Sequence, residues 1–154
     1  MLYSEPLAYF ITFTIHGSWL HGDERGAYQR GGVFIEPNQI LKAKKNAIAK
    51  DTLLRLSQEQ REMIGFAIDE LCARKNWQVH EKNIRTNHVH IVVTALGIKP
   101  EKVMAEIKAR TTFRLRKAGL LRAEQKLWTE HGSTIYLFTD QEFLQACEYV
   151  RDCQ

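Results

Sequence analysis

The sequence predicts one α+β domain of the split βαβ, ferredoxin-like (RRM-like) plan, with an antiparallel sheet that carries helices on one face and leaves the other open. Segments of alternating hydrophobicity interleave with segments of helical periodicity, in the order strand, helix, strand, strand, helix, strand. One extra helix follows at the end of the chain. No internal repeat or linker divides the chain, so we assign residues 1–154 to a single domain.

The first predicted strand covers residues 9–16, in which apolar and more polar residues alternate. The face expected to be buried consists of Tyr9, Ile11, Phe13 and Ile15. Residues 17–35 are rich in glycine and charge and predict a long loop, and loops of that length are uncommon unless they serve a function. A helical stretch is predicted over residues 39–50.

Two longer helices follow from capping signals and apolar stripes. Ser57 and Gln60 have the spacing of a capping box, which opens a helix that ends near Asn76. Pro100 suits the first turn of a second helix, and Gly119 is placed to close it. The residues expected to face inward are Ile64, Ala67, Ile68, Leu71 and Cys72 in the first helix, and Val103, Met104, Ile107, Thr111, Leu115 and Ala118 in the second.

The remaining predicted elements are three strands and a last helix. The strands cover residues 77–84, 88–96 and 134–139. Asp140 is expected to cap the helix over residues 141–152. Its inward face is predicted to consist of Phe143, Ala146, Cys147 and Val150.

Positive charge is concentrated in one part of the chain. The net charge is +4 and the pI is near 9.0, and between residues 108 and 126 seven Lys or Arg side chains stand against one acid, Glu124. Such a cluster either neutralises phosphates or forms a solvated helix face. The candidate DNA-backbone contacts are Lys108, Arg110, Arg114 and Lys117, and the candidates for contacting unpaired bases from the early loop are Trp19, His21 and Arg25.

The cysteine and hydropathy patterns point to a cytoplasmic protein. The three cysteines are Cys72, Cys147 and Cys153, without CxxC spacing, and they predict reduced thiols rather than a disulfide framework or a zinc site. No apolar run approaches the roughly 18 residues that span a bilayer, and the first residues lack a signal-peptide pattern. We therefore expect no association with a membrane.

His88 and His90 form the strongest candidate for chemistry. On a strand, alternate residues point the same way with Cα atoms about 7 Å apart, so both imidazoles can bind one metal ion. Val89, Ile91 and Val93 point the other way and are expected to pack on the helices, which places the histidines on the open face. A surface pair without a ligand is the alternative. A third ligand is needed from His80, an acid or an amide, and His80 faces the same way only if its neighbours in the strand face inward.

Four stretches, taken in order, resemble the HUH single-strand nucleases, and more closely the single-tyrosine transposases of bacterial insertion sequences and the REP-associated tyrosine transposases. They are residues 17–26 (GSWLHGDERG), 86–93 (TNHVHIVV), 127–134 (LWTEHGST) and 149–154 (YVRDCQ). The ordered set spans nearly the whole chain. Trp128, within the third stretch, is as compatible with a core position as with a ligand-facing one.

The resemblance implies that Tyr149 attacks a DNA phosphodiester and becomes a 5′-phosphotyrosine, while His88 and His90 hold a divalent metal, Mg²⁺ or Mn²⁺. Relatives supply a third ligand from a Gln or similar residue, typically four positions after the tyrosine, where this sequence has Cys153. Either the helix ends so that Gln154 turns toward the site, or Gln154 is not a ligand. We favour Gln154 over Cys153 because a thiolate suits zinc better. Tyr149 lies about 60° from Ala146 on the last helix, at the flank of its apolar stripe. A boundary tyrosine with a wetted hydroxyl is the alternative interpretation.

The resemblance also implies a substrate and an assembly. The substrate would be single-stranded DNA carrying a hairpin, from the end of a mobile element or a REP-like sequence. Relatives act as dimers that exchange catalytic helices or as monomers, and we favour a homodimer. The main alternative function is a non-catalytic, RRM-like module that binds single-stranded nucleic acid, for which Phe10 on the first strand is suitable. A metal hydrolase is disfavoured because the histidine pair has no obvious carboxylate partner.

Overall fold

The computed structural model describes residues 5–17, 27–28, 34–35, 53 and 55–152. Its elements are β1 (Ala8–Ile15), β2 (Ala27–Tyr28), β3 (Phe34–Ile35), α2 (Gln58–Lys75), β4 (Gln78–Ile84), β5 (His88–Thr94), α3 (Pro100–Lys117), β6 (Trp128–Leu137) and α4 (Asp140–Asp152). The predicted helix over residues 39–50 and most of the predicted loop over residues 17–35 lie outside the described residues. No helix of the described part is long and apolar enough to cross a membrane.

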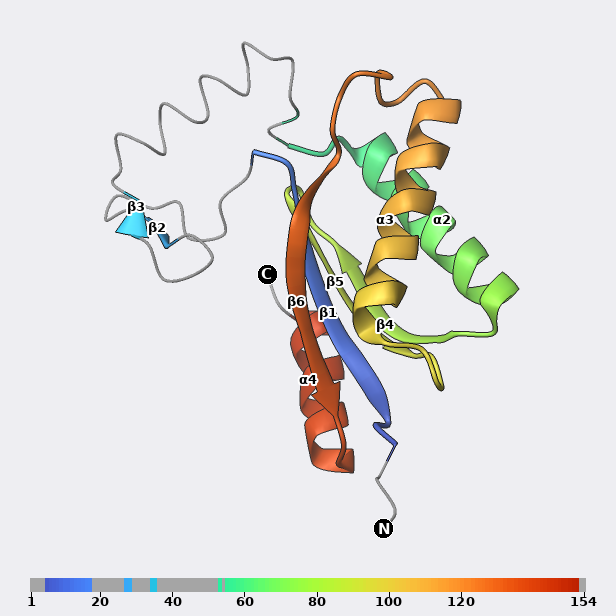
Figure 1. The fold of residues 1–154 in the computed structure, drawn as a ribbon, viewed down its shortest axis with the longest axis vertical. Helices are drawn as coiled ribbons and strands as arrows, with labels where there is room; N and C mark the ends of the chain where they lie inside the picture. Colours follow the sequence, from blue (N-terminus) through green and yellow to red (C-terminus); the bar gives the residue numbers. More distant parts are fainter. Residues whose placement is uncertain (1–4, 18–26, 29–33, 36–52, 54, 153–154) are drawn as a thin grey trace.

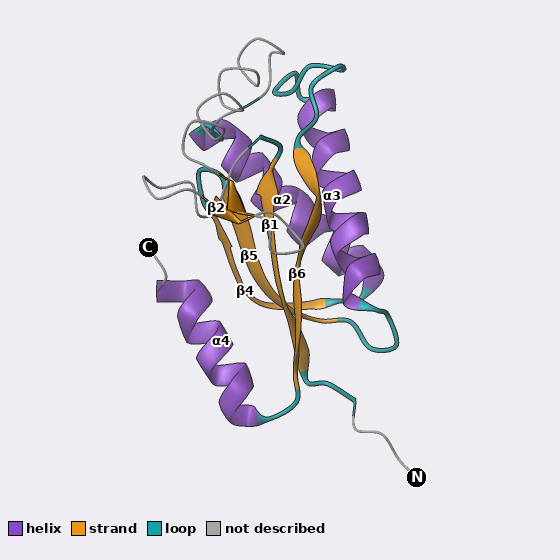
Figure 2. Cartoon of the chain, turned by 60° about the vertical axis from the view of Figure 1, so that its left-hand side comes forward, coloured by secondary structure: helices purple, strands orange, loops and turns teal. Residues whose placement is uncertain are grey.

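The main sheet has four antiparallel strands in the order β4-β5-β1-β6, which confirms the predicted α+β plan. Helices α2 and α3 cover one face of this sheet (Figure 1). The other face is not left open as predicted, because α4 packs across it against β4 and β5 (Figure 2). The sheet therefore lies between two helical layers, of which the α4 layer covers only part of its face.

The larger core lies between the sheet and the pair α2 and α3. Its strand side chains are the alternate residues predicted from the sequence: Tyr9, Ile11, Phe13 and Ile15 from β1, and Val89, Ile91 and Val93 from β5, all buried. The predicted inward faces of α2 and α3 are buried as well, except that Ala118 is exposed, because α3 ends at Lys117. Gly119 adopts φ +74°, and the amide of Leu120 donates to the carbonyl of Leu115 at 2.8 Å, which closes α3 as expected.

A smaller core holds α4 on the opposite face of the sheet. Val92 of β5 lies there together with Ala8 and Leu137, packed against the helix residues Ala146, Cys147 and Val150, with Phe10 and Phe143 half-buried at its margin. The predicted inward face of the last helix is therefore confirmed. Because β5 is covered on both faces, residues 89–93 are all buried, as is typical of a central strand.

The helix starts agree with the predicted capping, with one correction. Ser57 and Gln60 form the predicted capping box, with N···O distances of 3.1 and 2.8 Å. At α4 the capping residue is Thr139 rather than Asp140: the Thr139 hydroxyl accepts from the amide of Glu142 at 3.1 Å, and the Glu142 carboxylate accepts from the amide of Thr139 at 3.0 Å. Asp140 is already the first residue of the helix.

Strand β6 begins six residues before the predicted position 134. Trp128 pairs with Ile15 and Gly132 pairs with Phe13, with a register irregularity between them. Glu130 and His131 are exposed on this edge strand, and Gly132 adds no side chain, so the segment shows no alternating hydrophobicity. The pairing of this segment with β1 is therefore not evident from the sequence pattern.

Candidate active site

Strand β5 places His88 and His90 side by side on the sheet face that α4 covers. Their ring centroids are 4.6 Å apart and their planes meet at 77°. His90 is buried, with 7% of its surface exposed, and His88 is half-buried. The alternation argument therefore gave the correct side of the strand, although this side is partly covered by α4.

Each imidazole is oriented by a hydrogen bond at Nδ1. Thr12, which lies opposite His90 in register on β1, has its hydroxyl 2.9 Å from Nδ1 of His90. His88 Nδ1 lies 2.7 Å from the side-chain oxygen of Asn87. Because an amide oxygen only accepts, Nδ1 of His88 carries the proton and Nε2 keeps the lone pair. A hydrogen bond of this kind fixes the tautomer that binds a metal through Nε2.

Burial keeps both imidazoles neutral at neutral pH. Burial, assisted by the neighbouring His88 and the charge of Arg85, lowers the pKa of His90 to about 4. Burial also lowers the pKa of His88, again assisted by Arg85. A neutral imidazole is the form that binds a metal. The pair is therefore in the ligating protonation state at neutral pH.

Helix α4 brings Tyr149 to the histidine pair. The tyrosine ring lies 5.6 Å from that of His90 and 5.8 Å from that of Phe10, measured between centroids. About half of the Tyr149 surface, 52%, is exposed, as expected for a residue at the flank of the apolar stripe. Asn83 of β4 fixes this part of the helix by donating its side-chain amide to the carbonyl of Val150 at 2.9 Å.

A bulge in β4 decides the orientation that the sequence left open for His80. The register with β5 shifts between Val79 and Glu81, and the His80 ring packs against Phe143 of α4, with 4.8 Å between centroids. His80 Nε2 lies 2.7 Å from the Thr94 hydroxyl. Thr94 is four residues beyond His90, about 13 Å along the strand. His80 therefore shares the face of the histidine pair, but the structure places it away from the pair.

The imidazoles of His88 and His90 are chemically suited to supply two ligands to a divalent metal. Both rings engage Nδ1 within the described chain, so the two Nε2 atoms are the nitrogens that could bind a metal. Among the described residues, no group of three or more His, Cys, Asp or Glu side chains could hold a metal ion. Gln154, the predicted third ligand, lies outside the described residues. The described residues thus supply two candidate ligands and no complete metal site.

The site also contains residues that the sequence analysis did not identify. Thr12, Asn87 and Asn83 orient the two histidines and the helix of Tyr149 through the hydrogen bonds given above. Asn87 is adjacent to His88 in the sequence and could have been found from that position. Thr12 and Asn83 both lie opposite His90, on β1 and β4, and strand register is not readable from one sequence.

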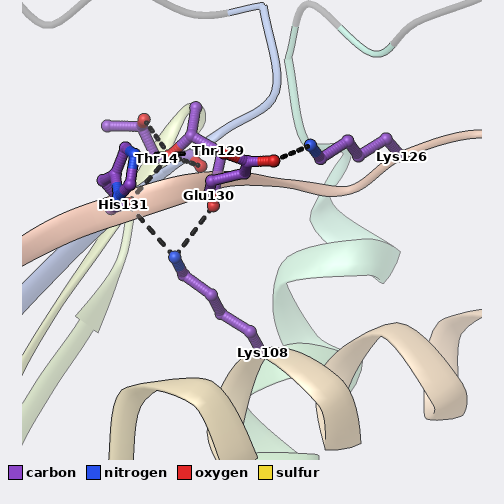
Figure 3. Close-up of polar contacts among 6 residues, drawn as sticks. All are labelled: Thr14, Lys108, Lys126, Thr129, Glu130 and His131. Atoms are coloured by element: carbon purple, nitrogen blue, oxygen red, sulfur yellow. Dashed lines mark hydrogen bonds and ion pairs between the residues drawn. The ribbon is translucent and has the colours of Figure 1, made fainter. Parts of the chain in front are cut away.

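The predicted DNA-contacting residues of α3 lie in the helical layer on the other side of the sheet (Figure 2). Lys108 donates from its ammonium group to the backbone carbonyls of Thr129 at 2.8 Å and His131 at 3.1 Å, and so anchors the edge strand β6 (Figure 3). Arg110 donates to the Glu70 carboxylate at 2.8 Å, and Arg114 lies 3.7 Å from the same oxygen.

Lys117 is exposed near the Phe113 ring, and Trp19 and Arg25 lie outside the described residues. Trp128 occupies the core: it is 4% exposed, and its indole N–H donates to the Thr111 hydroxyl at 2.8 Å. Next to it on β6, the Thr129 hydroxyl lies 3.3 Å from that of Thr14 (Figure 3). The structure thus brings together the tyrosine and the histidines and keeps the basic helix apart from them.

Comparison with known proteins identifies the family. Residues 46–152 match the family model described as "Transposase IS200 like". The match covers most of the chain, so the chain belongs to the IS200-like transposase family. Family membership in turn assigns it to the transposases, enzymes that cleave and rejoin DNA, and confirms the family resemblance predicted from the four sequence stretches.

Two solved structures share the fold. One is a REP-associated tyrosine transposase bound to a REP hairpin, with a TM-score of 0.55 and 13% identity over 97% of this chain and 68% of that chain. The other is a candidate transposase from Deinococcus radiodurans, with a TM-score of 0.57 and 9% identity over 99% of this chain and 94% of that chain. At these identities the likeness concerns the fold alone. No curated protein matches the chain.

Proposed function

We propose that the protein cleaves single-stranded DNA with the phenol of Tyr149 and rejoins it through a 5′-phosphotyrosine. The observation that carries the proposal is the position of the Tyr149 ring, half-exposed and 5.6 Å from His90, although the two residues come from elements on opposite sides of the small core. A tyrosine outside the core and beside two oriented, neutral imidazoles suits a nucleophile better than a packing residue.

The proposed reaction exchanges one phosphodiester for another. The Tyr149 oxygen forms a bond to the scissile phosphorus, the bond from phosphorus to the 3′ oxygen breaks, and the DNA leaves with a 3′-hydroxyl. The phenolic proton passes to solvent, and the leaving oxygen takes up a proton. No water is consumed, so attack by another 3′-hydroxyl on the phosphotyrosine reverses the step and joins a new strand.

The side chains of the site have separate tasks in this proposal. His88 and His90 would hold a divalent metal, Mg²⁺ or Mn²⁺, with Gln154 as the proposed third protein ligand. When bound, such a metal supplies positive charge that polarises the scissile phosphate. Thr12 and Asn87 hold the two imidazoles in position. The packing of α4 on β4 and β5 places the phenol next to the pair.

The proposed substrate is single-stranded DNA that carries a hairpin. The relative with the same fold and a described ligand is bound to a REP hairpin, and we extend this substrate class to the present chain. We also propose that the protein acts as a homodimer, which analytical ultracentrifugation tests directly: a sedimentation coefficient of the 17.9 kDa monomer at all concentrations would contradict it.

The function is tested by searching for a covalent intermediate. The protein is incubated with 5′- and 3′-labelled hairpin-bearing single-stranded DNA and Mn²⁺, denatured in detergent and resolved on a gel. The wild type is expected to retain the label of the strand lying 3′ of the cut, and Tyr149→Phe to retain none. Tyr136→Phe, which alters another exposed tyrosine away from the histidines, is the matched control and should behave as wild type.

Three outcomes would reject the proposal, each in favour of a specific alternative. Tight DNA binding without an adduct, unaffected by Tyr149→Phe, would favour a non-catalytic binding module. Cleaved DNA with no adduct would favour hydrolysis by activated water. An adduct of equal yield from wild type and Tyr149→Phe would move the nucleophile to another residue.

A further inference from the structure

An open groove runs between α3 and the start of β6, in the helical layer on the opposite side of the sheet from the histidine pair. Its volume is about 810 Å³. Its apolar lining includes Ala109, Leu127 and the core residue Trp128, and Phe113 forms part of the wall. We call this feature the α3–β6 groove. It is separate from the site proposed for cleavage, since neither histidine nor Tyr149 lines it.

The α3–β6 groove carries more positive than negative charge. Among the described residues, four cationic side chains line it, namely Lys108, Arg116, Lys117 and Lys126, against the single acid Glu130. Glu130 and Lys126 approach only to 3.9 Å with both side chains largely in solvent, so the pair neutralises little of the field. The excess of positive charge suits an anionic ligand.

Three of these cations are available to such a ligand, whereas Lys108 is committed to the carbonyls of β6. One terminal N–H of Arg116 donates to the carbonyl of Gln125 at 2.9 Å, which holds the guanidinium in place and leaves its other donors for an acceptor. Lys117 and Lys126 are exposed. Arg110 and Arg114, by contrast, share the carboxylate of Glu70 outside the groove.

The apolar part of the groove indicates what kind of anion it accepts. Phe113 exposes 51% of its surface on the wall, beside Lys117, whose ammonium lies 5.8 Å from the ring centroid. A duplex exposes its phosphates but keeps its base faces stacked inside, so no base face would contact the apolar lining. An unpaired strand presents base faces as well as phosphates, and aromatic side chains among cations are typical of sites for such strands.

We propose that the α3–β6 groove binds an unpaired DNA segment, with phosphates on Arg116, Lys117 and Lys126 and a base against Phe113. The choice of DNA rests on the function proposed above. The groove and the histidine site adjoin the same end of β1: the amide of His16 donates to the carbonyl of Leu127 at 2.8 Å, and the amide of Ile15 to that of Asn87 at 3.0 Å. A strand leaving the groove therefore reaches the histidine site around the start of edge strand β6.

The proposal is tested by the salt dependence of DNA binding. Fluorescence anisotropy of a labelled unpaired oligonucleotide is measured over a range of NaCl concentrations for the wild type and for the triple variant Arg116→Gln, Lys117→Gln, Lys126→Gln. Loss of three phosphate contacts on a single strand should reduce the slope of log K against log salt by about 2. Affinity at low salt should fall about tenfold or more.

Matched variants separate the groove from general charge and general aromatic effects. Phe113→Ala should weaken binding about fivefold or more, as loss of one stacked base does. Lys102→Gln removes an exposed charge from the far end of the same helix, and Phe66→Ala removes an aromatic ring of similar exposure outside the groove. Both controls should bind as the wild type does.

The following results would overturn the proposal. The first is a triple variant with wild-type affinity and slope. The second is a loss of affinity in the two controls as large as that in the groove variants. The third is tighter binding of a blunt duplex, or of an RNA of the same sequence, than of the unpaired DNA. Absence of DNA binding by the wild type would overturn it as well.

The binding assay is independent of the cleavage chemistry. Tyr149→Phe should bind DNA with the wild-type slope, because Tyr149 does not line the groove. If no covalent adduct forms but the groove variants lose affinity as described, the groove proposal stands and the cleavage proposal fails. If the adduct forms normally in the triple variant with unchanged affinity, the cleavage proposal stands and the groove proposal fails.

Discussion

The rings of His90 and Tyr149 lie edge to face, with 5.6 Å between centroids and 77° between planes, although 45 residues of chain separate the end of β5 from the start of α4 and the two elements meet through the small core. His90 is in turn fixed from the other side by the hydroxyl of Thr12 on β1. The arrangement thus depends on the register of β1 with β5 and on the packing of α4, and each of these can be altered separately.

Replacing Thr12 by Val should loosen His90 without removing a metal ligand. The change keeps the side-chain shape but removes the hydroxyl 2.9 Å from Nδ1, so the imidazole loses its orienting partner. Loss of such a partner lowers metal affinity by about 10- to 100-fold. We expect this loss for Mn²⁺ in isothermal titration calorimetry, with a parallel fall in adduct yield that excess Mn²⁺ partly restores.

The control for this prediction is Thr134→Val, which removes a hydroxyl from β6 that donates to Glu101 at 2.9 Å, away from the histidines. It should leave Mn²⁺ affinity unchanged. Equal metal affinity of Thr12→Val and wild type would show that Thr12 has no part in orienting His90.

Replacing Gly132 by Ala should destabilise the fold because the new Cβ has no room. It would lie 2.5 Å from the carbonyl oxygen of Thr12 and 2.6 Å from Sδ of Met104. The backbone oxygen belongs to the central strand β1 and cannot move freely. Overpacking of this kind costs about 1–3 kcal/mol, which urea unfolding followed by circular dichroism should report as a lower midpoint.

Gly65→Ala in α2 is the matched control and should raise the midpoint of urea unfolding. Within the described part of the chain, its Cβ would meet only the flexible ends of Lys82 and Ile84, at 3.5 and 3.6 Å. An alanine inside a helix is more stable than a glycine by about 1 kcal/mol. A midpoint for Gly132→Ala at or above that of wild type would contradict the close contact between β6 and β1.

The fold was largely predictable because its signals are local. The alternation of Tyr9, Ile11, Phe13 and Ile15 shows one strand face directly, and the capping box of Ser57 and Gln60 marks a helix start in four residues. The features that the sequence did not predict depend on contacts between distant parts of the chain. The early start of β6 and the β4 bulge arise from pairing with other strands, and the position of α4 across the sheet follows from the small core.

For the candidate site, too, the local features could be predicted from the sequence. Strand alternation placed His88 and His90 together without reference to the rest of the chain, and helical periodicity placed Tyr149 at the edge of a core. Their meeting depends on which sheet face α4 covers, which the residue pattern alone does not specify. The basic side chains of α3 show the limit of charge counting, because Arg110 and Arg114 face an acid from another helix.

Titration of Cys72 should weaken the fold at alkaline pH. Burial raises the pKa of this thiol to about 11 from its ordinary value of 9.0, with the charge of Asp69 adding to the effect. A pKa raised on folding stabilises the protein below the unfolded value, and this contribution is lost as pH rises from about 9 through 11. The two-unit shift corresponds to roughly 2.7 kcal/mol.

The measurement for Cys72 compares wild type with Cys72→Val, which has no thiol to ionise. The difference between their free energies of unfolding should change in favour of the variant as pH rises from 8.5 to 11, because tyrosines and lysines titrate alike in both proteins. A constant difference across this range would contradict the raised pKa.

Glu70→Gln should strengthen DNA binding by releasing two arginines. In the wild type the Glu70 carboxylate accepts from Arg110 at 2.8 Å and lies 3.7 Å from Arg114, and the side-chain hydrogen bond from Arg110 is the main reason why its pKa is lowered. While this carboxylate is present, Arg110→Gln should change the slope of log K against log salt by less than about 0.7, the contribution of one phosphate contact on a single strand.

Removing the carboxylate frees about two cations next to the α3–β6 groove, so the slope for Glu70→Gln should steepen by up to about 1.4 on an unpaired strand. Anisotropy titrations of Glu70→Gln, Arg110→Gln and the double variant form a cycle that isolates the coupling between the two side chains. If Arg110→Gln alone lowers affinity as strongly as the groove variants do, the guanidinium contacts DNA directly despite its ion pair, and the DNA surface of α3 extends beyond the groove.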